Sequence, residues 1–265
     1  MDDAVSLAGR VAIVTGAGNG LGRAEALALA AAGARLVLND LADDDVQATA
    51  EQIVADGGQA IVYAADIGEW ATGEQLVRAA VDAYGQLDIL VNNAGVLRDR
   101  MIFTMSSSEW DLVLRVHLRG HFITTRFATA HWREQSKAAG GPVYARIVNT
   151  SSEAFLLGSP GQPNYAAAKA GIAALTVVTA RSCARYGVRA NAICPRARTA
   201  MTADLMGAPP ARLLCSRQWA VANRVVTKWP RRCTRRTRSH SSADIVNTIR
   251  SRSTPALFTR MSSRP

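Results

Sequence analysis

The sequence of 265 residues predicts one α/β domain built on a doubly wound parallel sheet. Short runs rich in Val, Ile and Leu alternate with longer segments rich in Ala and Leu. The short runs are apolar throughout, which is typical of strands covered by helices on both faces. Connections that contain a whole helix are long enough to join parallel strands. Ligands bind such sheets at the carboxyl ends of the strands, so the residues there are the first site candidates.

This alternation predicts the position of each strand and helix. The expected strands cover residues 10–15, 35–39, 60–64, 88–91, 145–150 and 188–193. The expected helices cover residues 20–32, 43–56, 70–84, 107–132 and 164–186. No run of about 18 apolar residues occurs, so we expect no membrane-spanning helix.

The first strand is followed by a glycine-rich turn, Thr15-Gly16-Ala17-Gly18-Asn19-Gly20-Leu21-Gly22, after which a helix is expected. Glycines let the backbone turn tightly and approach a pyrophosphate, and the helix N-terminus offers free N–H groups. The spacing is Gly-x-x-x-Gly-x-Gly, and Leu21 stands where the general dinucleotide fingerprint has its last glycine. A plain strand–helix turn is the alternative, but the position between a strand and a helix favours a cofactor site.

Acidic residues follow the second and third strands. Asp40 lies 18 residues beyond Gly22, where a carboxylate accepts hydrogen bonds from ribose hydroxyls and repels a 2′-phosphate. No Arg or Lys occupies the glycine turn or positions 41–42, so NAD is favoured over NADP. A solvated aspartate that opens the next helix is the alternative for Asp40. Asp66, followed by Ile67, is suited either to meeting the adenine amino group or to capping the next helix.

The fourth strand is followed by Asn92-Asn93-Ala94-Gly95. Small residues there let a cofactor lie close, and asparagine side chains can tie strand ends together.

A tyrosine and a lysine share one face of the last long helix. Tyr165 and Lys169 are four residues apart, so the spacing places an ammonium beside a phenol. A positive charge lowers the pKa of a phenol, which can then exchange a proton near neutral pH. Ser152 lies thirteen residues before the tyrosine, after the fifth strand, where its hydroxyl can bond the same substrate oxygen. A surface Tyr and Lys on an Ala-rich helix is the alternative.

These motifs together resemble the short-chain dehydrogenase/reductase family over residues 9–202. The resemblance implies a Rossmann-type fold and an NAD-dependent oxidoreductase that interconverts a secondary alcohol and a ketone. It implies that Ser152 polarises the carbonyl, that Tyr165 exchanges the proton, and that Lys169 lowers the tyrosine pKa and holds the nicotinamide ribose. In Asn191-Ala192-Ile193-Cys194-Pro195 and the residues that follow, Pro195 and Thr199 match cofactor-contacting positions.

Two residues depart from the family pattern. His117 stands where the family has an asparagine that helps to hold a proton-relay water. An imidazole can serve the same relay, and a structural histidine is the alternative. Arg196 follows Pro195 at a position where the family has glycine. We expect this arginine to change the shape of the loop over the cofactor.

Some segments resemble the 3-hydroxyacyl-thioester dehydrogenase and 3-oxoacyl reductase-like branch of the family. They are residues 97–100, 116–122 and 137–144. Arg98 and Arg100 are suited to a phosphate-bearing carrier or are solvated surface arginines. The family also implies a homodimer or homotetramer paired through the helices predicted at 107–132 and 164–186. The expected ligand is a small-molecule alcohol or ketone.

Four cysteines, Cys183, Cys194, Cys215 and Cys233, show neither paired nor metal-like spacing. We therefore expect free thiols in a reducing, cytoplasmic compartment, and no metal. The acidic first residues lead directly into a strand pattern, which is not typical of a secretory signal.

Charge divides the chain into two parts. Residues 1–206 hold 18 Lys and Arg against 20 Asp and Glu, a balance of −2. Residues 207–265 hold 13 against one, a balance of +12, and only one of the 20 glycines. We therefore expect a dehydrogenase domain over 1–206 and a basic, atypical segment over 207–265.

Three interpretations of this basic segment compete: a nucleic-acid-binding tail, a solvated disordered extension, and out-of-frame translation after about residue 207. We favour the third, because the family pattern stops where glycine and acidic residues nearly vanish. The alternative functions are a catalytically impaired NAD-binding homologue and, less favoured, a basic protein associated with nucleic acid.

Overall fold

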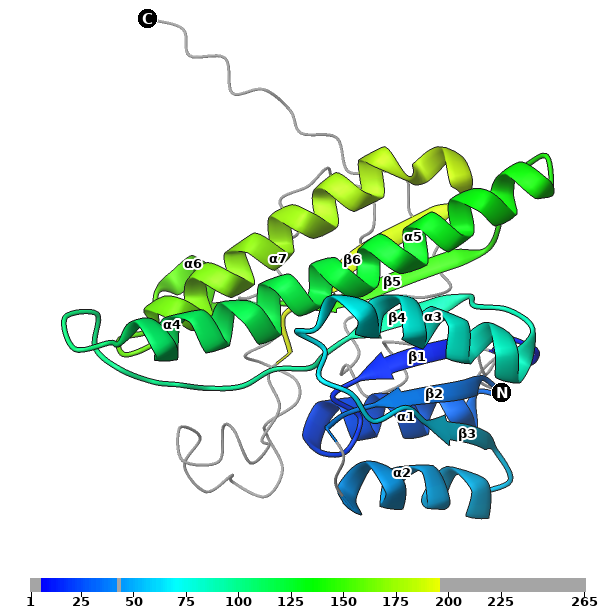
Figure 1. Cartoon of the computed structure of the whole chain (residues 1–265), viewed down its shortest axis with the longest axis horizontal. Coiled ribbons are helices and arrows are strands. Elements are labelled where there is room, and N and C mark those ends of the chain that lie inside the picture. Colours follow the sequence, from blue (N-terminus) through cyan, green and yellow to red (C-terminus); the bar gives the residue numbers. More distant parts are fainter. Residues whose placement is uncertain (1–5, 42–43, 196–265) are drawn as a thin grey trace, which may run out of the picture.

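The computed structural model describes residues 6–41 and 44–195, which form a six-stranded parallel sheet flanked by helices (Figure 1). The strands are β1 (Val11–Thr15), β2 (Arg35–Asn39), β3 (Gln59–Val62), β4 (Ile89–Asn92), β5 (Ala145–Thr150) and β6 (Val188–Ile193). The helices are α1 (Gly20–Ala31), α2 (Asp44–Ala55), α3 (Trp70–Tyr84), α4 (Ser107–Leu114), η1 (Arg115–Arg119), α5 (Gly120–Ala138), α6 (Ala154–Leu157), α7 (Pro163–Ser182) and η2 (Ala184–Tyr186). The predicted fold class is confirmed, and every predicted strand end lies within two residues of the observed end.

The strand order is β3-β2-β1-β4-β5-β6, and all the pairs are parallel. The chain runs outward from β1 to β3 and then returns to the other side of β1 with β4. The loops after β1 and β4 therefore diverge at the carboxyl edge of the sheet, which opens a crevice there.

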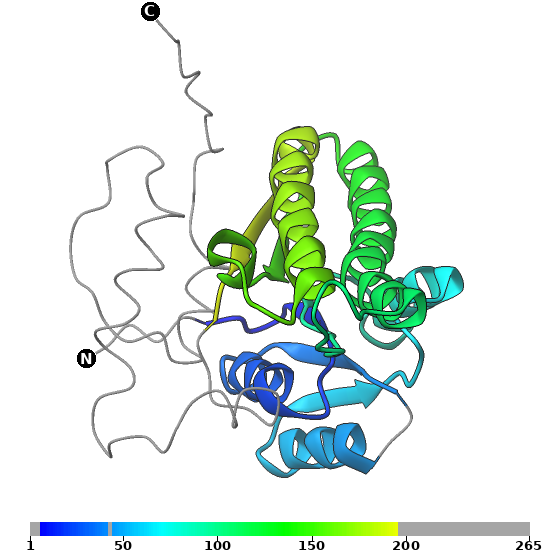
Figure 2. The same cartoon turned by 90° about the vertical axis from the view of Figure 1, so that its left-hand side faces the viewer.

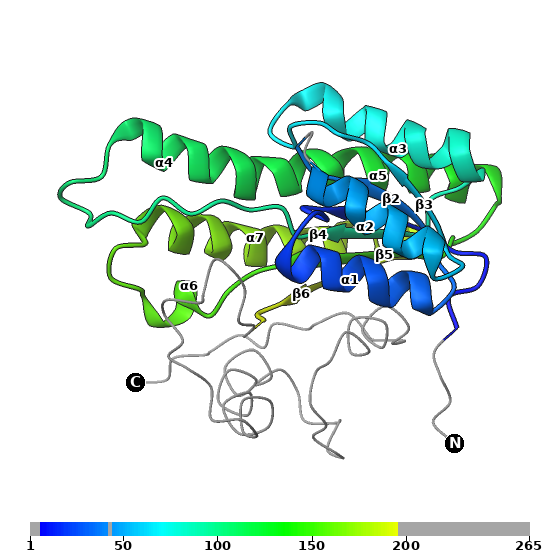
Figure 3. The ribbon, with the colours of Figure 1, turned by 90° about the horizontal axis from the view of Figure 1, so that it is seen from below.

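Helices cover both faces of the sheet. Figure 3 shows α1 and α2 on one face and α3, α5 and α7 on the other. The first face buries a cluster that includes Ala12, Leu29 and Leu36, and the second buries one that includes Ile13 and Trp132. Because adjacent residues of a strand point to opposite faces, Ala12 and Ile13 serve different clusters.

The helix predicted over residues 107–132 is confirmed as one continuous helical rod, which contains a π-helical segment and extends beyond the predicted end. A Ser106–Glu109 capping box starts α4, a π-helical segment, η1, follows, and α5 then runs on to Ala138. Figure 2 shows this long rod lying beside α7, which packs against both α4 and η1. A π-helical turn inserts one extra residue and re-aims the side chains after it, which is frequent at functional sites.

The helix predicted over 164–186 ends earlier, at Ser182, and is followed by η2. Gly187 then turns the chain into β6 with a φ of 89°. A Cβ at Gly187 would lie 1.9 Å from the carbonyl oxygen of Val143, so the neighbouring backbone requires glycine there. The short helix α6, directly after Ser152, was not predicted.

Among residues 6–41 and 44–195, no helix has both the length and the apolar character to cross a membrane. The predictions for Thr199, for Arg196 and for the basic segment 207–265 lie outside the described residues.

Candidate active site

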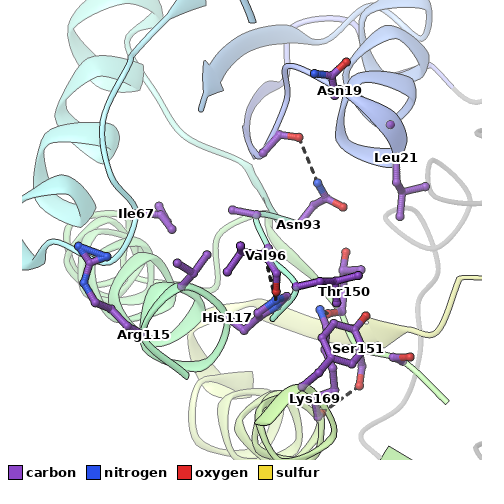
Figure 4. A pocket seen from close by; sticks show the side chains of 18 of the residues that line it. Asn19, Leu21, Ile67, Asn93, Val96, Arg115, His117, Thr150, Ser151 and Lys169 are labelled. Carbon is purple, nitrogen blue, oxygen red and sulfur yellow. Dashed lines mark hydrogen bonds between the residues drawn. The ribbon is translucent and has the colours of Figure 1, made fainter. Parts of the chain in front are cut away.

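A cavity of about 730 Å³ lies at the carboxyl ends of the strands. Figure 4 shows Asn19 and Leu21 on one side of it, Ile67 and Arg115 on another, and Lys169 opposite the glycine turn. Most of the predicted site residues line it, namely Gly16, Asn19, Gly20, Leu21, Asp40, Asp66, Ile67, Asn93, Ala94, Gly95, His117, Ser152, Tyr165, Lys169 and Pro195. Thr15 and Gly22 lie behind its wall, where they shape it through contacts with its lining residues.

Thr15 joins the glycine turn to β4. Its Oγ1 atom accepts hydrogen bonds from the backbone N–H groups of Asn93 (3.0 Å) and Ala94 (3.1 Å). The Asn93 amide in turn donates to the carbonyl oxygens of Thr15 and Gly16, both at 3.2 Å. These bonds fix the two loops that border the crevice relative to each other.

Gly16 and Gly22 are required by the close packing of the turn itself. Gly16 has a φ of 66°, and a Cβ there would lie 2.8 Å from the Cα of Ala94. A Cβ on Gly22 would lie 2.0 Å from the carbonyl oxygen of Gly16 and 2.5 Å from the Asn93 amide. Real Cβ atoms do not approach backbone this closely, so the first turn of α1 can lie here only without side chains at these positions.

The Asp40 carboxylate is held by backbone donors at the end of β2. One oxygen accepts from the N–H of Gly18 and the other from the N–H of Leu41, both at 2.9 Å. The bond to Gly18 ties this acid to the glycine turn, so Asp40 borders the cavity beside Asn19.

Asp66 is paired with a cation. Its carboxylate accepts a forked set of hydrogen bonds from the Arg115 guanidinium at 2.6–3.2 Å and another from Gly68 N–H at 2.7 Å. It does not cap the next helix, because the N-cap residue of α3 is Glu69. Arg115, at the start of η1, therefore joins the rim of the cavity, a role that no sequence motif indicated.

A buried amide network supports the site beneath β4 and β5. Asn92 donates to Asn149 at 2.9 Å and accepts from Thr124 at 2.7 Å, and Asn149 donates to Thr176 at 2.8 Å. The prediction that Asn92 ties strand ends together is confirmed. Asn149, Thr124 and Thr176 were missed, because the contacts span 27 to 57 residues of sequence.

The structure brings Ser152, Tyr165 and Lys169 together. The hydroxyl groups of Ser152 and Tyr165 are hydrogen-bonded to each other. The Lys169 ammonium lies 5.3 Å from the centre of the Tyr165 ring and donates to the carbonyl oxygen of Thr150 at 2.6 Å. Ser151 fixes the helix behind them, since its hydroxyl donates to the backbone oxygen of Lys169 at 3.0 Å.

Burial has the largest effect on the pKa values of Tyr165 and Lys169. Burial raises the pKa of Tyr165, while the hydrogen bond from Ser152 lowers it in part. Burial lowers the pKa of Lys169 to about 7, although Cys194 and Glu25 act in the opposite direction. The expectation that the lysine charge brings the tyrosine pKa below its ordinary value is therefore wrong for this geometry. An amine with this pKa carries only part of its charge at neutral pH.

His117 lies against Tyr165. Its ring meets the Tyr165 ring edge-on, with 5.3 Å between the ring centres. Its Nε2 atom lies 2.9 Å from the carbonyl oxygen and 3.0 Å from the N–H of Val96. Gly95 makes room for it, since a Cβ there would lie 2.4 Å from the imidazole. Burial lowers the pKa of His117 to about 3, so the ring is neutral at physiological pH.

Replacing His117 by asparagine should therefore leave the pH dependence of activity unchanged. A group with a pKa of about 3 does not change charge between pH 5 and 8. We expect the limbs of the wild-type and His117→Asn pH–rate profiles to coincide within about 0.3 pH unit, a difference worth about 0.4 kcal/mol. A limb that moves clearly further would mean that the imidazole titrates during turnover.

The fold and the site match one known family. The sequence model of the short chain dehydrogenase family matches residues 10–208. The chain therefore belongs to the short-chain dehydrogenase family.

Individual relatives indicate which branch of the family this chain resembles. The chain is 59% identical over 210 residues to a hydroxyacyl-CoA dehydrogenase of Mycobacterium tuberculosis, a match that covers 77% of this chain and 66% of that protein. It is 42% identical over 207 residues to the mouse (Mus musculus) peroxisomal multifunctional enzyme type 2, covering 75% of this chain and 27% of that enzyme. A crystal structure of a short chain dehydrogenase from Mycobacterium avium superimposes with a TM-score of 0.70 at 50% identity, covering 74% of this chain and 71% of that one. The chain thus spans 66% and 27% of the lengths of these two relatives.

Proposed function

We propose that this protein is an NAD(H)-dependent oxidoreductase that interconverts a secondary alcohol and a ketone, with a 3-hydroxyacyl thioester as substrate. One observation carries the proposal: the hydrogen-bonded hydroxyls of Ser152 and Tyr165 face the cavity that the glycine turn also borders. Lys169 stands behind the tyrosine in the same cavity.

The residues present fit a nicotinamide dinucleotide. The turn offers side-chain-free backbone at Gly16 and Gly20, beside the N-terminus of α1, which suits a pyrophosphate. Asp40 at one end of the cavity would hold the adenosine ribose, and Lys169 at the other end would hold the nicotinamide ribose. Thr15 and Asn93 keep the intervening wall in place. The bound cofactor supplies the hydride chemistry.

The protein supplies the acid and base. In alcohol oxidation the Tyr165 oxygen takes the proton of the substrate hydroxyl, and in ketone reduction it returns a proton to the same oxygen. The Ser152 hydroxyl donates a hydrogen bond to that substrate oxygen and polarises it. An ammonium on Lys169 favours the ionised phenol, and its bond to the Thr150 carbonyl fixes its position. His117 packs against the ring and fixes its orientation.

Asp40 supports the choice of NAD over NADP. Its carboxylate is oriented by Gly18 and Leu41, so a 2′-phosphate would meet a fixed negative charge. We expect Asp40→Ser to raise the ratio of kcat/KM for NADP to that for NAD by about 10–100-fold, which is 1.4–2.7 kcal/mol of discrimination. Initial rates with each cofactor measure it, and Glu51→Gln, which removes an exposed charge from α2, serves as the matched control. A ratio that stays at the wild-type value in Asp40→Ser would contradict this role.

The relative named as a hydroxyacyl-CoA dehydrogenase supports the substrate class. A substrate panel tests it: a 3-hydroxyacyl-CoA, the free 3-hydroxy acid and a simple secondary alcohol. We expect the thioester to have the highest kcat/KM. Equal kcat/KM values for all three compounds would be consistent with an oxidoreductase but would contradict a thioester as the preferred substrate.

We also propose that residues 1–206 form the dehydrogenase domain and that the protein is located in the cytoplasm. We further propose that it assembles as a homodimer or homotetramer. The match of the family model to residues 10–208 supports the boundary. The rod of α4, η1 and α5 beside α7 offers two long helices for subunit pairing. Light scattering of the full chain measures the oligomeric state.

A further inference from the structure

A glutamine at the start of α7 places an amide in the wall of the cavity. Gln162 lines the cavity, is 9% exposed, and is the N-cap residue of α7. A polar side chain at an N-cap commonly bonds the first free N–H groups of its helix, but the Gln162 side chain makes no such bond. The reaction derived above does not use this amide either.

The Gln162 side chain is held by Asp99, which lies in the loop after β4. The Nε2 atom of Gln162 donates to the Oδ2 atom of Asp99 at 2.9 Å, and this is the one hydrogen bond of that side chain within residues 6–41 and 44–195. An ionised carboxylate only accepts hydrogen bonds, so the contact fixes which end of the amide is the nitrogen. Asp99 takes one of the two N–H groups on that nitrogen, and the second is still a donor.

Backbone contacts on both sides of this aspartate keep the pair in place. The Asn164 amide donates to the carbonyl oxygen of Arg98 at 3.0 Å. The backbone N–H of Arg100 donates to the carbonyl oxygen of Gly161 at 2.7 Å. Asn164 is fully buried, and its Oδ1 atom accepts from the backbone N–H of Tyr165 at 2.7 Å. The loop is therefore joined directly to the first turn of the helix that carries the tyrosine.

The pair formed by Asp99 and Gln162 lies beside the reacting groups. Gln162 precedes Tyr165 by three residues, which is about one helical turn, and both residues line the cavity. Burial has the largest effect in raising the pKa of Tyr165, and the charge of Asp99 raises it further. The amide nitrogen is thus held at the side of the cavity where the substrate oxygen reacts.

A 3-hydroxyacyl thioester carries its reacting hydroxyl on C3 and its carbonyl oxygen on C1, with a single carbon between them. A residue that binds the carbonyl must therefore lie next to the groups that bind the hydroxyl. A carbonyl oxygen accepts hydrogen bonds, which matches the second N–H of the glutamine amide. We propose that Gln162 is a specificity-determining residue that donates a hydrogen bond to the thioester carbonyl, with its amide oriented by Asp99. The inference rests on the proposed function for its substrate class.

Two compounds that differ by one oxygen test this contact. They are 3-hydroxybutyryl-CoA and the thioether S-(3-hydroxybutyl)-CoA, in which a methylene replaces the carbonyl. Neither can be oxidised when NADH takes the place of NAD, so calorimetry of the full-length protein with NADH measures their affinities. We expect the wild type to bind the thioester about 5–30-fold more tightly than the thioether, the effect of one hydrogen bond. In Gln162→Met, which keeps the side-chain length without the amide, the two affinities should agree within about twofold.

Gln52→Met is the matched control. Gln52, in α2, donates to Asp56 at 2.9 Å and does not line the cavity, so the variant removes the same kind of bond at an exposed site. It should keep the wild-type preference for the thioester. Asp99→Ala, at an exposed position, keeps the glutamine but releases its amide. It should lower the preference by less than Gln162→Met does.

The outcomes separate this contact from the proposed reaction. A preference for the thioester that is absent in the wild type, or that persists in full in Gln162→Met, would overturn the role of Gln162. If Gln162→Met does not fold, an undiminished preference in Asp99→Ala overturns it as well.

Initial rates with NAD complete the test. A wild type that binds the thioester through Gln162 without oxidising it would contradict the proposed reaction and leave the contact intact. Oxidation of both compounds, with the same ratio of kcat/KM values in the wild type and in Gln162→Met, would do the reverse.

Discussion

Replacing Tyr165 by phenylalanine is expected to reduce turnover by about 10²–10⁴-fold, the usual contribution of a positioned general acid or base. The variant removes one oxygen, which is hydrogen-bonded to Ser152 and faces the cavity. It keeps the ring, and with it the edge-on contact with His117 and the ring face near Lys169. Loss of one hydrogen bond costs about 1 kcal/mol of folding free energy, so the protein should stay folded. Affinity for NAD, measured by calorimetry, should change by less than about threefold, or 0.6 kcal/mol.

Tyr84→Phe is the matched control for this variant. The Tyr84 hydroxyl donates to the carbonyl oxygen of Leu36 at 3.3 Å, and Tyr84 does not line the cavity. Its removal deletes the same atom from the same residue type and should leave kcat unchanged. Wild-type turnover in Tyr165→Phe would mean that another group carries the proton.

The second large effect is expected from Gly22→Ala. The added methyl would lie 2.0 Å from the carbonyl oxygen of Gly16 and 2.5 Å from the Asn93 amide, so one of the two loops must move. Both loops line the cavity, and the Asn93 amide holds the turn through its bonds to Thr15 and Gly16. We expect the free energy of unfolding to fall by about 1–3 kcal/mol, as for other overpacked sites. Affinity for NAD should fall by at least about 100-fold, or 2.7 kcal/mol.

Urea denaturation and calorimetry measure these two losses. Gly141→Ala is the control, because a Cβ at Gly141 meets nothing within 4 Å and its φ lies outside the range that demands glycine. It should match the wild type in both measurements. A Gly22→Ala protein that binds NAD with native affinity would show that the glycine turn does not form the cofactor site.

Local patterns in the sequence were enough to predict the fold and much of the cavity wall. The strands are apolar on both faces, and the glycine turn and the residues after each strand share one edge of a parallel sheet. The spacing of Tyr165 and Lys169 needs only helix geometry, and Ser152 needs only the end of β5. These predictions concern residues whose neighbours are fixed by secondary structure.

Features that depend on long-range packing could not be predicted in the same way. The π-helical turn that positions His117 follows the same sequence pattern as an ordinary helix. Arg115 meets Asp66 across 49 residues of sequence. The direction of the pKa change at Tyr165 was also wrong, because burial of the tyrosine itself raises its pKa, and helix spacing does not reveal that burial.

Transfer of an isotope label tests the central claim most directly. A 3-hydroxyacyl-CoA that carries deuterium on its hydroxyl-bearing carbon is incubated with NAD and the full-length protein, and the nicotinamide product is analysed by mass spectrometry. The proposed reaction moves that hydrogen as hydride, so the reduced cofactor should carry the deuterium and the acyl product should lack it. Reduced cofactor that forms without deuterium, or an unchanged substrate with both NAD and NADP, would contradict the assignment.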